Sequence, residues 1–275
     1  MPLSSTVVVT FDIAGPNRTC STRLVQGQLH GKVAVVTGGA RGVGRGIVAR
    51  FLDEGAHVVV VGRSTPESIP AGASFVAADV RDVEQVGRAI DAAIDRHGRL
   101  DVLVNNAGGS PNADAATVSP RFSASIIQLN LIAPLWLAQR ANAIMQAQPE
   151  GGAIVNIASV SGTRPSPGTA AYGAAKAGLI NLTQSLAVEW APKVRVNAIV
   201  AGPIKTELAA MHYGSEAGIA AVGATIPLGR LGAPEDVGDA CVFLASERAR
   251  WISGAALLIH GGGERPAFLD AAKTT

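Results

Sequence analysis

The stretch VVTGGARGVGRG, residues 35–46, sets the expectation for the whole fold. It starts in a β-rich apolar run, passes through a turn of glycines, and leads into a helical pattern, GRGIVARFLDEG. Gly38, Gly42 and Gly44 would give a tight turn and let the backbone approach a pyrophosphate, an anion that the N-terminus of the next helix favours. Because this motif has meaning only between a strand and a helix, its context predicts a dinucleotide site rather than an ordinary Gly-rich loop.

The alternation of apolar strands and helices continues from Lys32 almost to the end of the chain. Such alternation implies right-handed crossovers and a parallel sheet. We therefore expect an α/β fold, a single doubly wound Rossmann domain with a seven-stranded parallel sheet and helices on both faces. The expected strands are KVAVVTG (32–38), HVVVVG (57–62), SFVAADV (74–80), LDVLVNNAG (100–108), AIVNIAS (153–159), VRVNAIV (194–200) and AALLIHGG (255–262). The expected helices cover residues 44–55, 84–98, 119–148, 170–191 and 234–246.

The domain organisation follows from where this alternation starts and stops. Residues 1–30 lack a sustained period and contain Gly, Pro, Ser and Thr, so we expect a partly ordered N-terminal extension. The Rossmann domain is expected over residues 31–263, followed by a C-terminal tail at 264–275. No internal repeat and no Pro/Ser-rich linker divides the domain.

The composition narrows the class of protein. Of the 275 residues, 48% are hydrophobic and 16% are charged, which suits a compact globular domain better than disorder or a fibre. The formal net charge is +2 without a dense Lys/Arg run, so we expect no nucleic-acid partner. We expect no apolar stretch to approach the roughly 20 residues of a membrane helix, and the first 20 residues lack the basic region of a secretory signal. We therefore expect no membrane partner.

The chain has two cysteines, Cys20 and Cys241, and five histidines. Cys241 lies in an apolar helical pattern and Cys20 in the irregular leader, so we expect no structural disulfide. We therefore expect a cytoplasmic location, where thiols stay reduced. The histidines show no paired ligand spacing, and we predict no metal site.

The second expected strand bears on the choice of cofactor. Sites for NAD place an Asp or Glu about 20 residues after the glycines, where it binds the ribose hydroxyls. Gly62 takes that place here, with Arg63 beside it, and Arg41 lies in the Gly-rich turn. A guanidinium can bind a 2′-phosphate, which an acid would repel. NADP(H) is therefore preferred and NAD(H) is the alternative, with Glu67 as the rival acid; both arginines could also be solvated surface groups.

The stretch TAAYGAAKAGL, residues 169–179, places Tyr172 and Lys176 on one face of an expected helix. A nearby ammonium stabilises a phenolate and so lowers the pKa of a tyrosine. A tyrosine of this kind can exchange a proton with a carbonyl or alcohol oxygen. Taken alone, the spacing fits a structural Tyr with an exposed Lys at least as well.

Two more polar residues lie where they can join this pair. Ser159 ends a strand at the carboxyl edge, where ligands bind in open α/β sheets, although a turn or helix cap is the alternative. Asn130 interrupts an apolar helical stretch, as a structural hydrogen-bonding residue or as a link in a proton path.

Taken together, these motifs resemble the classical short-chain dehydrogenase/reductase family over residues 31–263. The resemblance rests on Thr-Gly-x-x-x-Gly-x-Gly at Thr37–Gly44, Asn-Asn-Ala-Gly at Asn105–Gly108, and the spacing of Ser159, Tyr172 and Lys176. It is closest to the type that reduces 3-oxoacyl thioesters.

The resemblance implies four catalytic residues. Tyr172 would be the acid/base, and Ser159 would orient the substrate carbonyl and stabilise its developing charge. Lys176 would lower the pKa of Tyr172 and hold the nicotinamide ribose, and Asn130 would hold a water that links Lys176 to solvent.

The resemblance also implies contacts along the cofactor. Asp79 would meet the adenine amino group beside the Val80 backbone, Asn106 and Gly108 would line the adenosine side, and Thr206 would contact the carboxamide. The full set of expected cofactor-binding residues is Thr37, Gly38, Arg41, Gly42, Val43, Gly44, Arg63, Asp79, Val80, Asn106, Ala107, Gly108, Tyr172, Lys176, Gly202 and Thr206.

Two positions depart from the family pattern. Ala201 precedes Gly202 where Pro-Gly is usual, and His260 stands where the family usually has Asp before two glycines. The first puts a nicotinamide contact in question and the second a local structural interaction.

The expected reaction is hydride transfer between nicotinamide and a ketone or secondary alcohol. The long segment after Pro203 is the expected lid that sets substrate choice, with 108–122 as the opposite wall. Met211, His212 and Tyr213 could face the substrate or serve only in packing. Rival hypotheses are an NAD-linked dehydrogenase and a non-enzymatic NADP(H) sensor.

Family members usually form tetramers through two long helices, and a homotetramer, or a dimer, is expected.

Overall fold

The computed structural model describes residues 6–11, 20–264, 266, 268 and 272. Its main sheet has seven strands in the order β5-β4-β3-β6-β7-β8-β9, and every neighbouring pair is parallel. The strands are β3 (Val33–Thr37), β4 (His57–Gly62), β5 (Ser74–Ala77), β6 (Val102–Asn105), β7 (Gly152–Ser159), β8 (Val194–Ala201) and β9 (Ala256–Ile259). The predicted fold class is confirmed.

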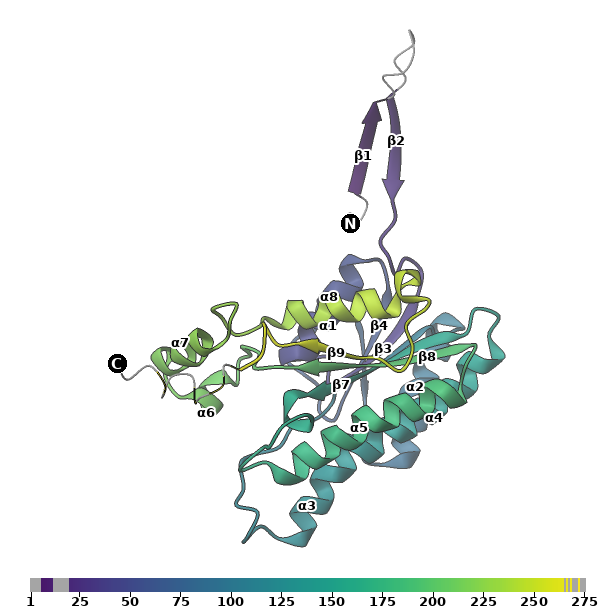
Figure 1. The fold of residues 1–275 in the computed structure, drawn as a ribbon. Helices are drawn as coiled ribbons and strands as arrows, with labels where there is room; N and C mark the ends of the chain where they lie inside the picture. The colour runs from purple at the N-terminus through teal and green to yellow at the C-terminus, as the bar shows by residue number, and fades with distance from the viewer. Residues whose placement is uncertain (1–5, 12–19, 265, 267, 269–271, 273–275) are drawn as a thin grey trace.

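Helices cover both faces of this sheet (Figure 1). One face carries α1 (Gly42–Asp53) and α8 (Pro234–Ala245), and the other carries α2 (Val83–His97), α4 (Ala133–Ala147) and α5 (Ala170–Glu189). Strand β3 is apolar throughout because it is buried on both sides: Val33 and Val35 pack toward α2 and α4, whereas Ala34 and Val36 pack toward α1 and α8.

The order of the strands creates the crevice in which a ligand can lie. From β3 the chain proceeds outward to β4 and β5, then crosses back to place β6 on the other side of β3. The connections after β3 and β6 therefore diverge at the carboxyl ends of these two strands. This is the position at which open α/β sheets bind ligands.

The expected helix over 119–148 contains a change of pitch. It is built from α3 (Pro120–Ile127), a π-helical turn at Gln128–Ile132, and α4. Pro134 explains the irregularity, since its ring has no N–H and clashes with the carbonyl four residues earlier, that of Asn130. The π turn thus lies at the residue that the sequence analysis singled out.

The expectation that no apolar stretch approaches membrane length is wrong. The continuous helix Pro120–Ala147 is long and apolar enough to cross a membrane on length and composition alone, because residues 122–139 contain no charged side chain. Core helices of globular proteins pass the same test, and this helix packs on the sheet through Leu137, Ala141 and Met145. Only 33% of the apolar window is fully buried within the chain, and most of its other residues are half-buried.

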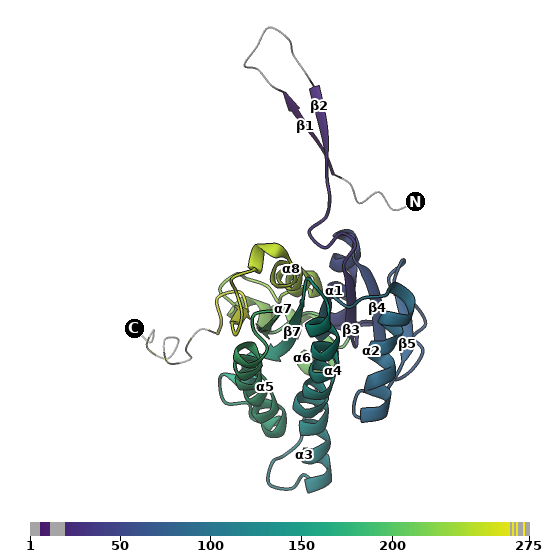
Figure 2. The ribbon, with the colours of Figure 1, turned by 90° about the vertical axis from the view of Figure 1, so that its right-hand side faces the viewer.

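The N-terminal extension contains a two-stranded antiparallel sheet that the sequence analysis did not predict. Strand β1 (Thr6–Phe11) pairs with β2 (Cys20–Val25), and Cys20 lies in this strand rather than in irregular chain. Figure 2 draws this hairpin apart from the seven-stranded sheet. Residues 1–5 and 12–19 of the extension lie outside the described residues.

The expected lid between β8 and α8 folds as a small unit of its own. It contains α6 (Ala209–Tyr213) and α7 (Glu216–Thr225), beyond the end of the sheet in Figure 1. Ala209, Ile219, Ile226 and Leu231 form a buried cluster separate from the main core. The unit begins and ends at a single neck, where Ile204 forms a β-bridge with Gly232.

Candidate active site

The Gly-rich turn is tied to the end of β6 by Thr37, the last residue of β3. The buried Thr37 hydroxyl accepts hydrogen bonds from the backbone N–H groups of Asn106 (3.0 Å) and Ala107 (2.9 Å). The Asn106 side chain returns a bond to the Thr37 carbonyl at 2.9 Å. The predicted motifs at Thr37–Gly44 and Asn105–Gly108 therefore meet at the crevice, although the Asn106 amide serves the turn itself.

The turn can form only with glycine at two of its positions. Gly42 has φ +50°, in the left-handed region that side chains disfavour. A methyl group added to Gly44 would lie 2.2 Å from the Gly38 carbonyl oxygen. Gly42 opens α1, whose N-cap residue, Arg41, makes no side-chain capping bond, and Val43 packs against the core beneath.

The expected adenine end of the site is positively charged. Arg41 and Arg63 are both exposed at the carboxyl ends of β3 and β4, and the Arg63 charge lowers the pKa of Asp79. Asp79 itself is held by Arg81, which donates from Nη2 at 2.6 Å and from Nε at 3.0 Å. This ion pair is the main reason why the pKa of Asp79 is lowered. Asp79 would therefore share its oxygens between Arg81 and adenine. Val80, buried beside Asp79, belongs to the core.

Ser159 and Tyr172 lie close together. Ser159 ends β7, and Tyr172 lies in the first turn of α5, near enough for the Ser159 hydroxyl to lower the pKa of the Tyr172 phenol, against the larger effect of burial. The Ser159 oxygen also accepts the Ser161 backbone N–H at 3.2 Å, which fixes the turn after the strand. The turn-cap role and the pairing with Tyr172 are thus both present.

The expected net lowering of the Tyr172 pKa is not seen. Burial raises the pKa of Tyr172 above its ordinary value, and the neighbouring Ser159 hydroxyl offsets this only in part. The ammonium lies 5.6 Å from the centre of the Tyr172 ring rather than at its hydroxyl. Tyr172 consequently keeps its proton at neutral pH, the state required of a proton donor.

Lys176 is buried, with its side chain 3% exposed. Its ammonium donates to the carbonyl of Ile157, two residues before Ser159, at 2.7 Å. Burial lowers the pKa of Lys176 to about 8, so the group remains mostly charged at neutral pH. The ammonium has three N–H donors, of which Ile157 takes one.

Asn130 is a structural hydrogen-bonding residue that positions the Asn-Asn-Ala-Gly segment. Its side-chain oxygen accepts the Gly109 N–H at 2.9 Å, and its amide donates to the carbonyls of Gly109 (3.0 Å) and Ile126 (2.9 Å). A methyl group added to Gly108 would lie 2.6 Å from the Asn130 oxygen and 3.3 Å from the Lys176 ammonium. The backbone at Gly108 therefore lies against both residues, and Asn130, Lys176 and this segment form one cluster.

The two departures from the family pattern lie side by side. Ala201 pairs with Ile259 in the sheet, and the Gly202 N–H donates to the Ile259 carbonyl at 2.9 Å. A methyl group on Gly202 would come within 2.7 Å of the His260 Cβ. Gly202 is thus required by the neighbouring strand as well as by any ligand.

The start of the lid lies over the Gly-rich turn. Thr206 is close to Gly42, since a methyl group added there would lie 3.5 Å from the Thr206 Cγ2. The next residue, Glu207, accepts a hydrogen bond from the Gly42 N–H at 3.2 Å. Sequence reasoning missed Glu207 because nothing in its local sequence marks a contact with a residue 165 positions earlier.

The rim of the expected substrate site is formed by three segments. Arg164, in the loop after Ser159, forms an ion pair with Glu264, and both charges act on the half-buried Tyr213 hydroxyl, although burial is the main reason why the pKa of Tyr213 is raised. Met211 is 79% exposed and contributes little to packing. The side chain of His212 lies outside the described residues. Tyr213 packs against the lid cluster, so the packing alternative holds for it.

The predicted opposite wall, residues 108–122, is attached to the same loop. The Ala113 N–H donates to the Gly168 carbonyl at 2.8 Å, and Asn112 lies directly against Gly168. The wall and the loop that precedes Tyr172 therefore share one position in the fold.

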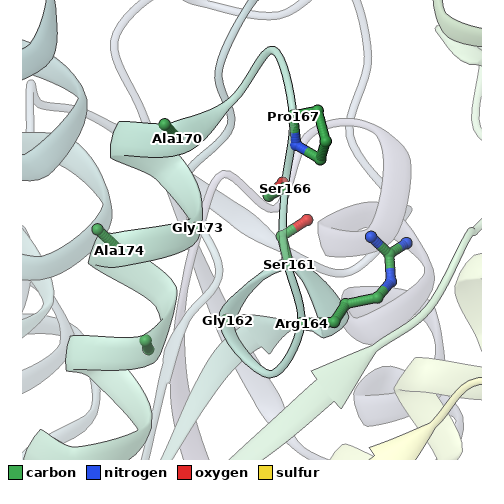
Figure 3. A pocket seen from close by; sticks show the side chains of 9 residues that line it. Ser161, Gly162, Arg164, Ser166, Pro167, Ala170, Gly173 and Ala174 are labelled. Carbon is green, nitrogen blue, oxygen red and sulfur yellow. The ribbon is translucent and has the colours of Figure 1, made fainter. Parts of the chain in front are cut away.

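An open hollow of about 450 Å³ lies between this loop and α5 (Figure 3). In Figure 3, Ala170 and Ala174 line it from the helix, opposite Ser161 and Arg164. Positions 170 and 174 lie on a different face of α5 from Tyr172 and Lys176. The hollow is therefore outside the Ser159–Tyr172 site.

Comparisons with known proteins agree with this geometry. A family model described as enoyl-(acyl carrier protein) reductase matches residues 38–264. The 3-oxoacyl-[acyl-carrier-protein] reductase FabG of Vibrio harveyi is 35% identical over 243 residues, which cover 85% of this chain and 98% of that protein. The 3alpha-hydroxysteroid dehydrogenase of Mediterraneibacter gnavus is 36% identical over 246 residues, which cover 85% of this chain and 97% of that protein.

Solved structures share the fold. The aldohexose dehydrogenase of Thermoplasma acidophilum superposes with a TM-score of 0.81 at 34% sequence identity, over 86% of this chain and 96% of that one. The three relatives differ in what they act on, but their matches span nearly their full lengths. The chain therefore belongs to the short-chain dehydrogenase/reductase family, whose members are NAD(P)-dependent oxidoreductases acting on CH–OH or C=O groups.

Proposed function

We propose that this protein is an NADP(H)-dependent oxidoreductase that interconverts a ketone and a secondary alcohol, with Tyr172 as the acid/base. The observation that carries the proposal is that the hydroxyls of Ser159 and Tyr172 are neighbours beside the buried Lys176 ammonium. A pair of hydroxyls backed by a buried positive charge can bind one substrate oxygen and transfer a proton to it.

The residues at the crevice fit a nicotinamide dinucleotide. The Gly-rich turn brings bare backbone to the N-terminus of α1, and Gly42 there already binds a carboxylate, that of Glu207. A helix N-terminus that binds one anion suits a pyrophosphate. Thr37, Gly38, Gly42 and Gly44 would hold that group. When bound, the nicotinamide supplies or accepts the hydride.

The proton chemistry belongs to the chain's own residues. In the reductive direction, the Tyr172 hydroxyl gives its proton to the substrate oxygen while Ser159 holds that oxygen by a hydrogen bond. Because the pKa of Tyr172 is raised, the protonated form, which is the one that donates, is the resting form. The Lys176 ammonium stabilises the phenolate left behind and has donors to spare for a ribose hydroxyl.

Asn130 can supply the proton path through its main chain. Pro134 has no N–H to donate to the Asn130 carbonyl, so this carbonyl lacks its α-helical partner at the π turn. A water bound there would link Lys176 to solvent, while the Asn130 side chain holds Gly109 in place.

Preference for NADP(H) over NAD(H) is part of the proposal. It is supported by Gly62 in place of an acid, and by Arg63 and Arg41 exposed at the strand ends where a 2′-phosphate would lie. Asp79 gives no contrary signal, because Arg81 neutralises it. The alternative is an NAD-linked dehydrogenase of the same fold.

The proposed substrate is a small carbonyl compound, with 3-oxoacyl thioesters first among the candidates. The similarity to the Vibrio harveyi reductase supports this choice, whereas the steroid and sugar dehydrogenases among the relatives show how widely substrates vary within the family. The lid and residues 108–122 would set specificity.

A homotetramer built on the α4 and α5 helices, in the cytoplasm, completes the proposal. In the long helix containing α4, only 33% of the apolar window is fully buried within one chain. The buried thiol of Cys241, whose pKa burial raises, is unreactive and suits a reducing compartment.

The decisive experiment compares wild type with Tyr172→Phe in NADPH consumption against a panel of ketones and 3-oxoacyl thioesters. We expect the variant to lose at least about a hundredfold in kcat while still binding NADPH, because the proton donor is removed and the Gly-rich turn is intact. Equal turnover by the two proteins would contradict the assignment. Nucleotide binding without turnover of any substrate by the wild type would favour an NADP(H) sensor.

A further inference from the structure

The first acidic residue of the lid occupies the anion-binding position of the Gly-rich turn. The Glu207 carboxylate accepts the Gly42 N–H at 3.2 Å, and Gly42 is the first residue of α1. The N-terminus of a helix attracts negative charge through its free N–H groups and its dipole. Because Arg41 makes no capping bond, the α1 terminus has no N-cap side chain to satisfy it.

The neck of the lid holds Glu207 close to this position. Two residues before it, the Lys205 N–H donates to the Gly232 carbonyl at 2.8 Å, and Gly232 in turn donates to the Pro203 carbonyl at 3.0 Å. Gly232 lies just before α8, whose first residue, Pro234, packs against Gly46 of α1 so closely that a methyl group there would come within 2.5 Å. The neck and α1 thus belong to one frame.

Beyond Glu207 the lid packs as a unit around its own buried cluster, which includes Ile219 and Ile226. The ion pair of Lys205 with Glu216 at 3.1 Å joins α7 to the neck, and the Leu228 N–H donates to the Gly261 carbonyl at 3.0 Å. The hydrogen bond from Gly42 is therefore a link between the position of the lid and the anion site at α1.

We propose that Glu207 is a built-in competitor for the cofactor pyrophosphate, so that cofactor binding displaces its carboxylate from Gly42 and releases the start of the lid. Two anions cannot share one N–H donor, and their charges repel each other at this distance. Glu207 would thereby couple occupancy of the cofactor site to the position of the segment that covers the substrate. The inference rests on the proposed function, since it assumes that a dinucleotide binds at α1.

The test measures binding rather than turnover. Titration calorimetry with NADP⁺, NAD⁺ and inorganic pyrophosphate compares wild type with Glu207→Gln, and with Glu207→Ala should the first variant fold poorly. We expect each ligand to bind the variants about two- to tenfold more tightly, because all three carry the pyrophosphate with which the carboxylate competes.

Glu235→Gln is the matched control. Glu235 is exposed in the first turn of α8, near α1, and its replacement removes the same charge without touching Gly42. We expect its affinities to equal those of wild type. An equal gain in both variants would reduce the effect to net charge and overturn the proposal, as would unchanged affinities in Glu207→Gln and Glu207→Ala.

Hydrogen exchange follows the lid itself. In wild type, NADP⁺ should raise the exchange rate of peptides covering residues 207–213, whereas in Glu207→Ala, which has no side-chain oxygen to accept the Gly42 N–H, these peptides should exchange fast from the start. Identical lid exchange in the two proteins would also overturn the inference. If neither protein binds a nicotinamide nucleotide, the proposed function fails instead, and that outcome is distinct from binding without a difference.

Discussion

At the scale of single residues, the site depends on a charge placed where charge is unfavourable. Lys176 is buried and reaches one carbonyl, that of Ile157, yet in the proposed mechanism its ammonium has to remain charged to stabilise a phenolate on Tyr172. The consequence is a lowered pKa, about 8, for Lys176. Activity and stability therefore place opposite demands on this residue.

The stability contribution of Lys176 should depend on pH in a defined window. Below pH 8 both the folded and the unfolded chain hold the proton, and above 10.5 neither does. In between, only the unfolded chain holds it, so the free energy of unfolding should rise with pH, by up to about 3 kcal/mol. Urea unfolding of wild type and Lys176→Met between pH 7 and 10.5 checks this. The free energy of unfolding of wild type should rise relative to that of Lys176→Met as the pH rises. A difference that stays constant over this range would contradict the prediction.

The proposed preference for NADP(H) depends on a single residue, Arg63. Arg63→Asp should weaken NADP⁺ binding by about tenfold or more and strengthen NAD⁺ binding relative to it, because a carboxylate repels the 2′-phosphate and accepts bonds from ribose hydroxyls. Kd values for both nucleotides provide the measurement. Arg88→Asp makes the same change of charge at an exposed position on α2 and should leave the ratio of the two constants as it was.

Residue identity predicted the partners at the site better than their physical effects. The contact between Ser159 and Tyr172 could be predicted from spacing and the strand end. The direction of the Tyr172 pKa could not, because it depends on how deeply the hydroxyl is buried. Likewise, an Asn within an apolar stretch predicts side-chain hydrogen bonds, but only the fold shows that Gly109 is the partner of Asn130.

At the scale of elements, the glycines of the chain serve two opposite purposes. Gly44 allows α1 to start against the Gly38 carbonyl, where any larger residue would collide. Gly87, inside α2, has nothing within 4 Å of the place where a methyl group would lie. The first is required by packing, whereas the second only loosens its helix.

This contrast predicts stability changes of opposite sign. Gly44→Ala should lower the free energy of unfolding by about 1–3 kcal/mol through the forced backbone shift, and should weaken nucleotide binding. Gly87→Ala should raise it by about 0.5–1 kcal/mol, because alanine favours the helix and meets no neighbour. Denaturant midpoints of the two variants beside wild type decide the matter, and two changes of the same sign would refute the argument.

The seven strands and the main helices could be predicted because each carries a local signal. Strands buried on both faces are continuous apolar runs, and α2 begins at the capping residue Asp82 and ends at Gly98. The π turn was missed although its cause, Pro134, is visible in the sequence. The β1–β2 pairing was missed because its two strands carry no clear alternation of polar and apolar residues.

At the scale of the whole molecule, the proposed assembly would use the side formed by α4 and α5. In the apolar window of the long helix before Gln148, 33% of the residues are buried within one chain, and α5 presents small exposed side chains, such as those of Ala174 and Ala177. Figure 2 shows α4 and α5 on one side of the molecule. Assembly through this side could be expected only from the family resemblance, since sequence does not distinguish a core face from an interface.

We expect wild type to sediment as a tetramer and Ala174→Arg to give smaller species with an unchanged circular dichroism spectrum. The guanidinium would fill the hollow beside α5 in Figure 3 and leave a charge in the interface. Ala71→Arg, in the exposed turn before β5, introduces the same group elsewhere and should remain tetrameric. A monomeric wild type, or equal assembly of all three proteins, would contradict the proposed interface.

The hydrogen bonds of Thr37 have a consequence for unfolding. They join the ends of β3 and β6, at the boundary between the strands that lie outward from β3 and those that lie outward from β6. A molecule bound across that boundary contacts both sets of strands at once. While it stays bound, the two halves of the sheet cannot separate as a first step of unfolding, so a ligand there would stabilise the folded state.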